Sequence, residues 1–507
     1  MSRSAASLLL LIPCLLLIVA LNEKRDVLPQ RLQGVVVTQS GGVPGARVRF
    51  QGERQLVQSD VRGRFRLPVS HTRKRITAAK PGSFNASAWS DSEPLRIFLM
   101  PLPGSDFEQY PWIDATPNPG RHMACGNCHG EIYREWNESA HARSGNNRRL
   151  INLYDGSTWK SGKHAGWSLL REHPDGAGVC AACHAPTLEP DAAGDHDLRR
   201  ARNLNGLSGV HCDYCHKIQG PADGQIGLTH GRFGLHVLRP KQGQLFFGPL
   251  DDVDRGEEAW SPFQRESRYC ASCHEGTVFG VPVYTTYSEW LESPAAREGK
   301  QCQDCHMAPT GRMSNIAPGH GGIERDPKTL ANHRFFDESL GQMLTRSLRL
   351  DLTADRTTSG VEVHATLTAD NVGHRVPTGF VDRHLLLLVQ AFDKEGHAVL
   401  ARMGPTLPQV AGRDVAGQPG RLYAKQLRDF EGQSPAPFWR ADPEPIDNRL
   451  RPRVPDVSRY VFPEAAASIQ VRVLYRRFWP EVAEIKRWPD NEVEVIRIEK
   501  SVPDGSR

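Results

Sequence analysis

The sequence has almost no excess charge and no apolar run of ordinary membrane-spanning length. Its 507 residues carry 63 Lys and Arg against 58 Asp and Glu, a formal net charge of +5. The N-terminal apolar run, residues 8–21, is shorter than the roughly 20 apolar residues of a transmembrane helix. Only one of the eleven cysteines, Cys14, lies outside a single repeated motif. The cysteine chemistry of this chain is therefore the chemistry of that motif.

The repeated motif is C-x-x-C-H, which occurs five times between residues 125 and 306. Its spacing is that of covalent c-type haem attachment, in which two thiols add to the porphyrin and the adjacent His binds the iron. On one helical turn, positions i, i+3 and i+4 share a face, so all three side chains can reach one haem. Zinc and thioredoxin-like sites also use C-x-x-C, but they do not demand a following His in every copy. The predicted attachment residues are Cys125, Cys128, Cys180, Cys183, Cys212, Cys215, Cys270, Cys273, Cys302 and Cys305, and the predicted proximal iron ligands are His129, His184, His216, His274 and His306.

Five haems must form the core of the region that carries them. The motifs leave about 36 residues per haem, which is too little chain to bury five macrocycles by side-chain packing alone. We therefore expect a loop-rich region with short helices whose folding depends on haem. Each ferric haem with two ionised propionates adds about −1, so the loaded protein is expected to be near neutral, and nucleic acid is not an expected partner.

The N-terminal 21 residues are predicted to direct export. Arg3 precedes the apolar run, which fits a signal sequence or an N-terminal membrane anchor over residues 1–21. No A-x-A box precedes a good cleavage point, which favours the anchor, although Ala20 stays a candidate for cleavage. Because c-type haem is attached on the outer side of the energised membrane, we expect the periplasm or the outer face of the cytoplasmic membrane.

Residues 32–103 are predicted to form a small β-sandwich. Polar and apolar residues alternate in ARVRF at 46–50 and RFRL at 64–67, as in half-buried strands. The sequences GVVV at 34–37, VPGARV at 43–48 and SDVRGRF at 59–65 resemble the carboxypeptidase-regulatory-like family, which implies adhesion or spacing. Residues 22–103 hold fourteen Lys and Arg and six Asp and Glu. This surplus favours binding to an anionic membrane surface or an acidic partner. The alternative is that these residues form a solvated basic face.

Four sequence matches cover the region of residues 119–345. They are CGNCH at 125–129 with EIY, Trp136 and SAH shortly after it, GVHCDYCH at 209–216, TYSEW at 286–290 and CQDCHM at 302–307. Together these matches resemble the cytochrome c-554 family of multihaem cytochromes. The resemblance implies closely stacked haems, mostly with two His ligands, that transfer electrons in the periplasm.

Residues 346–500 are predicted to form a second β-sandwich. Strand patterns lie at 348–352, 361–368, 385–392, 469–475 and 493–498. The sequence NVGHRVPTG at 371–379 resembles a motif of C-terminal domains attached to multihaem cytochromes, with no chemical role indicated. The expected fold class is multidomain: a loop-rich, mainly α multihaem cytochrome c domain flanked by two β-sandwich domains.

The sixth ligand of each haem decides whether that haem carries electrons or binds a substrate. His141, in WNESAH, and His333, in NHRF, are the first predicted distal ligands. His211 lies too close to the third motif to reach the far face of its own haem. Residues 257–270 contain no His, which leaves open that one haem lacks a sixth ligand from the protein. Further candidates, each equally readable as an ordinary surface or hydrogen-bonding His, are His164, His230, His236 and His320.

We expect an exported pentahaem cytochrome, with five covalently bound haem c groups, that transfers electrons between periplasmic or membrane redox proteins. The sequence leaves a membrane tether open and does not indicate the oligomeric state. The alternative is a multihaem oxidoreductase that acts on a small nitrogen or sulfur compound at an open haem. No motif has Lys in place of its His, the change that marks the active haem of pentahaem nitrite reductases, and no extra Cys or Tyr motif marks a cross-linked haem. We therefore predict no catalytic residue and favour the electron carrier.

Overall fold

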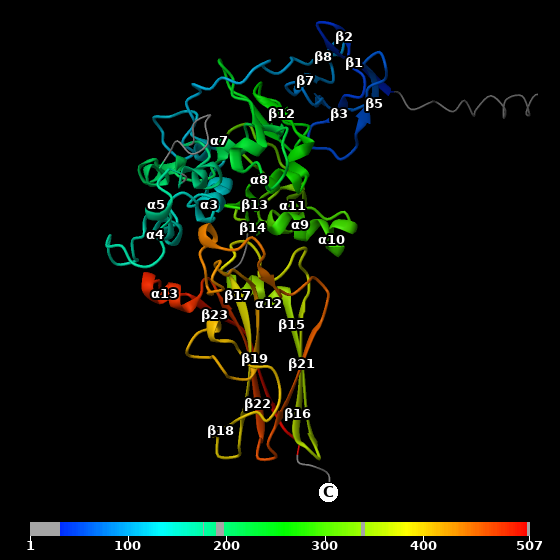
Figure 1. The fold of residues 1–507 in the computed structure, drawn as a ribbon. Helices are drawn as coiled ribbons and strands as arrows, with labels where there is room; N and C mark the ends of the chain where they lie inside the picture. The colour runs from blue at the N-terminus through cyan, green and yellow to red at the C-terminus, as the bar shows by residue number, and fades with distance from the viewer. Residues whose placement is uncertain (1–30, 176, 189–196, 336–339, 504–507) are drawn as a thin grey trace, which may run out of the picture. The chain divides into compact units, whose positions relative to one another are not determined.

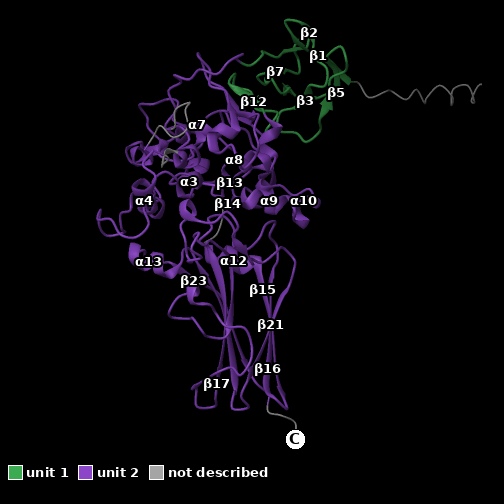
Figure 2. Ribbon diagram, in the orientation of Figure 1, with its two compact units in different colours: residues 1–102, 250–260 green, residues 103–249, 261–507 purple. Residues whose placement is uncertain are grey.

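The computed structural model of the chain describes residues 31–175, 177–188, 197–335 and 340–503. The predicted export segment, residues 1–21, lies outside these described residues. The chain divides into two compact units, residues 1–102 with 250–260 and residues 103–249 with 261–507 (Figure 2). The second unit holds all five C-x-x-C-H motifs and the C-terminal strands. Within the described ranges, no helix is long and apolar enough to cross a membrane.

The first unit is built from two sheets that share one hydrophobic core. One sheet has the order β2-β1-β5, with β8 parallel to β1, and the other has the order β4-β3-β6-β7. In β5 the alternation predicted from the sequence holds, because Phe65 and Leu67 are buried while Arg64 and Arg66 are exposed. Apolar side chains from both sheets form the core. The strands are β1 Arg31–Thr38, β2 Gly41–Gly42, β3 Arg47–Phe50, β4 Val57–Gln58, β5 Arg64–Pro68, β6 Arg75–Ala79, β7 Ala86–Trp89 and β8 Arg96–Phe98.

Residues 250–260 belong to the first unit, although in sequence they lie between the third and fourth motifs. Asp251 accepts hydrogen bonds from Arg47 and from Arg49, the latter at 2.7 Å. The guanidinium of Arg47 also lies 4.7 Å from the ring centre of Trp260, in strand β12 Glu258–Trp260. An acidic residue from a distant part of the chain thus pairs with two of the basic residues of β3.

The motif-bearing part of the second unit is made of short helices, 3-10 turns and small hairpins, as expected for a loop-rich haem region (Figure 1). The residues before it, 104–118, contain no regular element, yet Tyr110 is buried and Trp112 packs edge-on against His211. The helices are α2 Cys125–Cys128, α3 Gly130–Glu138, α4 Arg148–Asp155, α5 Leu169–Glu172, α6 Ala181–His184, α7 Cys212–Cys215, α8 Arg268–His274, α9 Thr286–Leu291, α10 Pro294–Arg297, α11 Cys302–His306 and α12 Leu340–Ser347. The short strands are β9 Ile218–Pro221, β10 Leu235–Val237, β11 Phe246–Gly248, β13 Glu275–Val278 and β14 Val281–Thr285.

The C-terminal part of the second unit contains a three-stranded sheet, β15-β16-β21, and a six-stranded sheet, β20-β19-β17-β22-β23 with β18 on β17. Side chains of both sheets share one core. Leu385 and Leu387 of β17 face this core, whereas Leu386 and Leu388 face a second cluster that includes α13 and Leu153 of the haem part. Burial on both faces explains the unbroken apolar run of β17. The elements are β15 Leu348–Thr357, β16 Gly360–Ala369, β17 His384–Phe392, β18 Ala398–Val399, β19 Gly420–Gln426, β20 Ile446–Asp447, β21 Asp456–Phe462, β22 Ser468–Arg476, α13 Pro480–Lys486 and β23 Glu492–Ser501.

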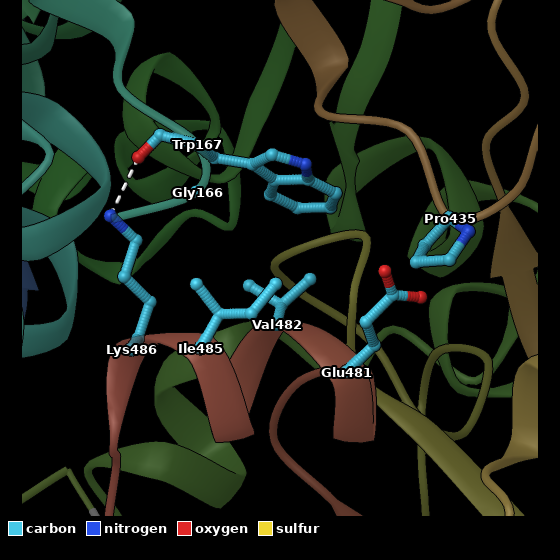
Figure 3. Close-up of a pocket in the computed structure, with 7 residues that line it drawn as sticks. All are labelled: Gly166, Trp167, Pro435, Glu481, Val482, Ile485 and Lys486. Atoms are coloured by element: carbon cyan, nitrogen blue, oxygen red, sulfur yellow. Dashed lines mark hydrogen bonds between the residues drawn. The ribbon is translucent and has the colours of Figure 1, made fainter. Parts of the chain in front are cut away.

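Helix α13 joins the C-terminal sheets to the haem part. The fully buried Lys486 ammonium donates to the carbonyl oxygens of Asn152 at 2.9 Å and Trp167 at 2.6 Å, the latter drawn in Figure 3. Trp488 Nε1 donates to Asn152 Oδ1 at 2.9 Å. The pocket beside this contact has a volume of about 40 Å³, far below the roughly 300–1,000 Å³ of ligand pockets. The pocket therefore belongs to a structural joint and is not a substrate site.

Candidate haem-binding sites

Each C-x-x-C-H motif lies on a single helical turn. Helices α2, α7 and α11 begin at the first Cys of a motif, α6 begins one residue after it, and α8 contains a whole motif. The turn is closed by its backbone, since the His129 amide donates to the Cys125 carbonyl and the His216 amide to the Cys212 carbonyl, both at 2.9 Å. The two thiols and the imidazole of a motif are therefore on one side of the turn, as the spacing predicts.

Backbone carbonyls orient the proximal imidazoles. His129 Nδ1 donates to the Ile316 carbonyl oxygen at 2.8 Å, and His216 Nδ1 donates to the Phe247 carbonyl oxygen at 2.6 Å. A proton held on Nδ1 leaves Nε2 unprotonated, which is the form that binds a metal. The donor set of these motifs thus fits a c-type haem: two free thiols for the porphyrin and one imidazole nitrogen for the iron.

The electrostatic environment also keeps these imidazoles neutral. Burial lowers the pKa of His184, His274 and His306 to about 4 in each case. Neutral imidazole is the metal-binding form, so these three imidazoles are ready to bind a metal at neutral pH.

Thiols of different motifs lie next to one another, and their contacts order the five motifs in space. Cys125 of the first motif is within hydrogen-bonding reach of Cys212 of the third, and Cys183 of the second is within reach of Cys273 of the fourth. The third motif adjoins the fourth, because the hydroxyl of Tyr269, next to Cys270, donates to the Cys215 carbonyl oxygen at 2.8 Å.

The fifth motif joins the same series, because Cys302 is within hydrogen-bonding reach of Cys270 of the fourth. Since these sulfurs mark the porphyrin edges, the first motif adjoins the third, the third adjoins the fourth, and the second and fifth both adjoin the fourth.

His141 lies opposite the proximal His of the fourth motif. Its ring centroid is 6.2 Å from that of His274, and the two ring planes are at 86°. A metal–imidazole bond is about 2.0–2.1 Å and the ring centre lies about 1 Å behind the nitrogen, so two rings on opposite sides of one metal have centroids about 6 Å apart. Burial lowers the pKa of His141 to about 3. The geometry fits a ligand pair, although the ligand role stays a prediction.

His333 lies near the proximal imidazoles of the first and third motifs. His216 and, more weakly, His129 act electrostatically on it, and burial lowers its pKa to about 4. The backbone of His333 is held from α3, because its amide donates to the buried Glu135 carboxylate at 2.8 Å. Its position fits a distal ligand within this pair of motifs.

The remaining candidate histidines differ in how far they are buried. His230 is half-buried beside Gly276, just after the fourth motif, whereas His164, His236 and His320 are exposed. The predicted distal-ligand roles of these four histidines stay predictions.

The buried His211 has a structural role as the N-cap of α7. Its Nδ1 accepts a hydrogen bond from the Tyr214 amide at 3.3 Å, and its Nε2 lies 3.1 Å from Thr187 Oγ1. Both ring nitrogens therefore have partners in the protein.

His374 is a candidate that sequence reasoning missed. Its ring centroid lies 6.2 Å from that of His306, the proximal His of the fifth motif, with the ring planes at 10°. His374 belongs to the loop of residues 371–379 before β17, outside the region in which distal ligands were expected. The available signal was the NVGHRVPTG motif itself, which contains His374.

A buried ion pair supports the third motif. Lys217 Nζ and Asp213 Oδ1 are 2.5 Å apart, and neither side chain is exposed. Asp213 Oδ2 also accepts from the Ile113 amide at 2.9 Å, and the Tyr110 hydroxyl donates to Gln244 at 2.7 Å. Residues 104–118 are thus tied into the haem part by specific hydrogen bonds.

Comparison with known proteins supports the same chemistry. The family model of cytochrome c554 and c-prime matches residues 124–217, which contain the first three motifs. The crystal structure of a penta-heme cytochrome c552 from Thermochromatium tepidum is similar, with a TM-score of 0.53 and 24% sequence identity over 74% of this chain and 97% of that chain. No curated protein matches this chain. At this identity the structural likeness shows the fold, and with the motifs and the family match it supports a multihaem cytochrome c with covalently bound c-type haem.

Proposed function

We propose that this protein is an exported pentahaem c-type cytochrome that transfers electrons between periplasmic redox partners. The observation that carries the proposal is that the motifs adjoin one another. The thiols of Cys125 and Cys212 are neighbours, as are those of Cys302 and Cys270, and Tyr269, next to Cys270, donates to the Cys215 carbonyl oxygen at 2.8 Å. Haems attached at neighbouring sulfurs have neighbouring edges, and such a row suits electron transfer over the length of the haem part.

In this proposal the chain supplies attachment, orientation and burial. Haem iron, when bound, takes up and releases single electrons. The thiols hold each porphyrin in place, and the carbonyls of Ile316 and Phe247 fix the imidazoles of His129 and His216 with Nε2 free. These hydrogen bonds hold the proton of each imidazole on Nδ1.

Export and partners follow from the N-terminal part. The apolar residues 8–21 would carry the chain across the membrane, where haem is attached, and would tether it there if they are not removed. The basic surplus of residues 22–103 suits an acidic redox partner or an anionic membrane surface. Residues 32–103, which resemble the carboxypeptidase-regulatory-like family, would act as a spacer in this proposal.

Haem counting and spin-state spectroscopy test the proposal. Pyridine haemochrome analysis of protein made in a strain with full cytochrome maturation should give five haems per chain, all retained after acid-acetone extraction. The oxidised protein should be low-spin and should not bind cyanide. A stoichiometry clearly below five would contradict the pentahaem proposal, and a cyanide-binding high-spin haem in the unmutated protein would favour the oxidoreductase instead.

A further inference from the structure

We infer that His374, from the C-terminal sheet region, is the second axial ligand of the haem attached at Cys302 and Cys305, on the face opposite His306. The inference rests on the proposed attachment of haem at the fifth motif. It gives a chemical role to the NVGHRVPTG motif and makes the C-terminal part a component of the redox unit.

The ring geometry is the first support. The His306 and His374 centroids are 6.2 Å apart and their planes are nearly parallel, at 10°, which matches the separation of about 6 Å expected for two imidazoles on one metal. His374 Nδ1 donates to the Arg375 carbonyl oxygen at 3.0 Å. That bond leaves Nε2 as the nitrogen available to iron, as in the proximal ligands His129 and His216.

The second support is a buried carboxylate that holds the His374 loop against the haem part. Glu289, in α9, is only 6% exposed. Its carboxylate accepts hydrogen bonds from Thr378 Oγ1 at 2.8 Å and from the Arg375 amide at 3.3 Å, both in the loop just C-terminal to His374. Glu289 belongs to the TYSEW sequence shortly before the fifth motif, so two sequence motifs with no other assigned role meet at this point.

Arg449 completes the clamp from the C-terminal side. Its guanidinium is 2.6 Å from the Glu289 carboxylate and donates to the Pro377 carbonyl oxygen at 3.1 Å. The same guanidinium binds Asp447 in a bidentate pair at 2.9 and 2.7 Å. A buried, fully paired network of this kind holds a loop in one position, which is what an axial ligand contributed by a distant segment requires.

The glycine of the motif is explained by close approach. A Cβ added at Gly373 would lie 3.2 Å from the Ala295 Cβ and 3.4 Å from the Trp290 Cδ1, both in the α9–α10 region. A side chain at this position requires the loop or these two neighbours to shift by a few tenths of an ångström. Gly373 therefore packs closely against the haem part, next to His374 in the chain.

The experiment compares His374→Ala with the unmutated holoprotein. We expect one haem to change from low-spin to high-spin in the electron paramagnetic resonance spectrum and one equivalent of cyanide to bind, with haem content unchanged. Added imidazole should restore the low-spin signal, and His374→Met should stay low-spin with a new sulfur-to-iron charge-transfer band. His397→Ala is the matched control, because the His397 side chain is 79% exposed in the same C-terminal part.

The outcomes separate the inference from the proposed function. An unchanged low-spin spectrum in His374→Ala, with haem found on the Cys302–Cys305 peptide by mass spectrometry, would overturn the ligand assignment alone. Absence of haem from that peptide in the unmutated protein would overturn both. Glu289→Ala should shift part of the same haem to high spin and Glu289→Gln should shift less of it, because Glu289 is a positioning residue for His374.

Discussion

Replacing His141 by Ala should convert the haem of the fourth motif from low-spin to high-spin. The His141 and His274 rings are 6.2 Å apart, so removing one ring opens one face of one iron. With five haems, about one fifth of the iron changes spin state, and one equivalent of cyanide or carbon monoxide binds. The thiols of Cys270 and Cys273 are untouched, so haem content should stay constant.

The assay is electron paramagnetic resonance with spin quantitation of the oxidised protein. Perpendicular axial imidazole planes give a low-spin signal with one very large g value, whereas parallel planes give a rhombic signal. The 86° angle between His141 and His274 and the 10° angle between His306 and His374 therefore predict that His141→Ala and His374→Ala remove different signals.

Two further variants separate ligation from packing. The His141 ring is 4.0 Å from the Phe335 ring, centroid to centroid, so the Ala variant also loses packing. His141→Phe keeps a ring of similar shape without a metal-binding nitrogen and should show the same spin change, while His164→Ala, at an exposed position, should show none. A low-spin spectrum that survives in both the Ala and the Phe variant would refute the ligand assignment.

Three other changes test the remaining sites. His333→Ala should make one haem of the first or third motif high-spin, with exposed His320→Ala as its control, and an unchanged cyanide titration would contradict this. Asp213→Asn removes the negative charge paired with the buried Lys217 ammonium and should lower stability by about 3–5 kcal/mol, much of which a second change, Lys217→Met, should restore in thermal unfolding. Burial raises the pKa of Asp382 to about 8, above its value of about 4 in the unfolded state. Between these two pKa values the folded state binds more protons than the unfolded state, so stability falls as the pH rises from about 4 to about 8. Asp382→Asn should remove that part of the slope, and the melting-temperature advantage of the variant should be larger at pH 8 than at pH 5.

The amino-acid sequence by itself determined the haem chemistry, because that chemistry is local. Two thiols and an imidazole at i, i+3 and i+4 need only one helical turn, and each of the five motifs lies on such a turn in the structure. The strands of the sheets could also be predicted, since alternation as in Arg64–Pro68 reports one buried face.

Tertiary structure decided what stands opposite each motif, since distal ligands come from elsewhere in the chain. Sequence spacing favoured His141 and His333 and could not assign either to a particular motif. The NVGHRVPTG motif marked His374 but did not connect it with the fifth motif, because only the folded loop brings His374 to His306. Likewise, Cys125 and Cys212 are neighbours through folding alone. Contacts between distant segments depend on how loops and sheets pack, and such packing leaves no periodic signal in the sequence.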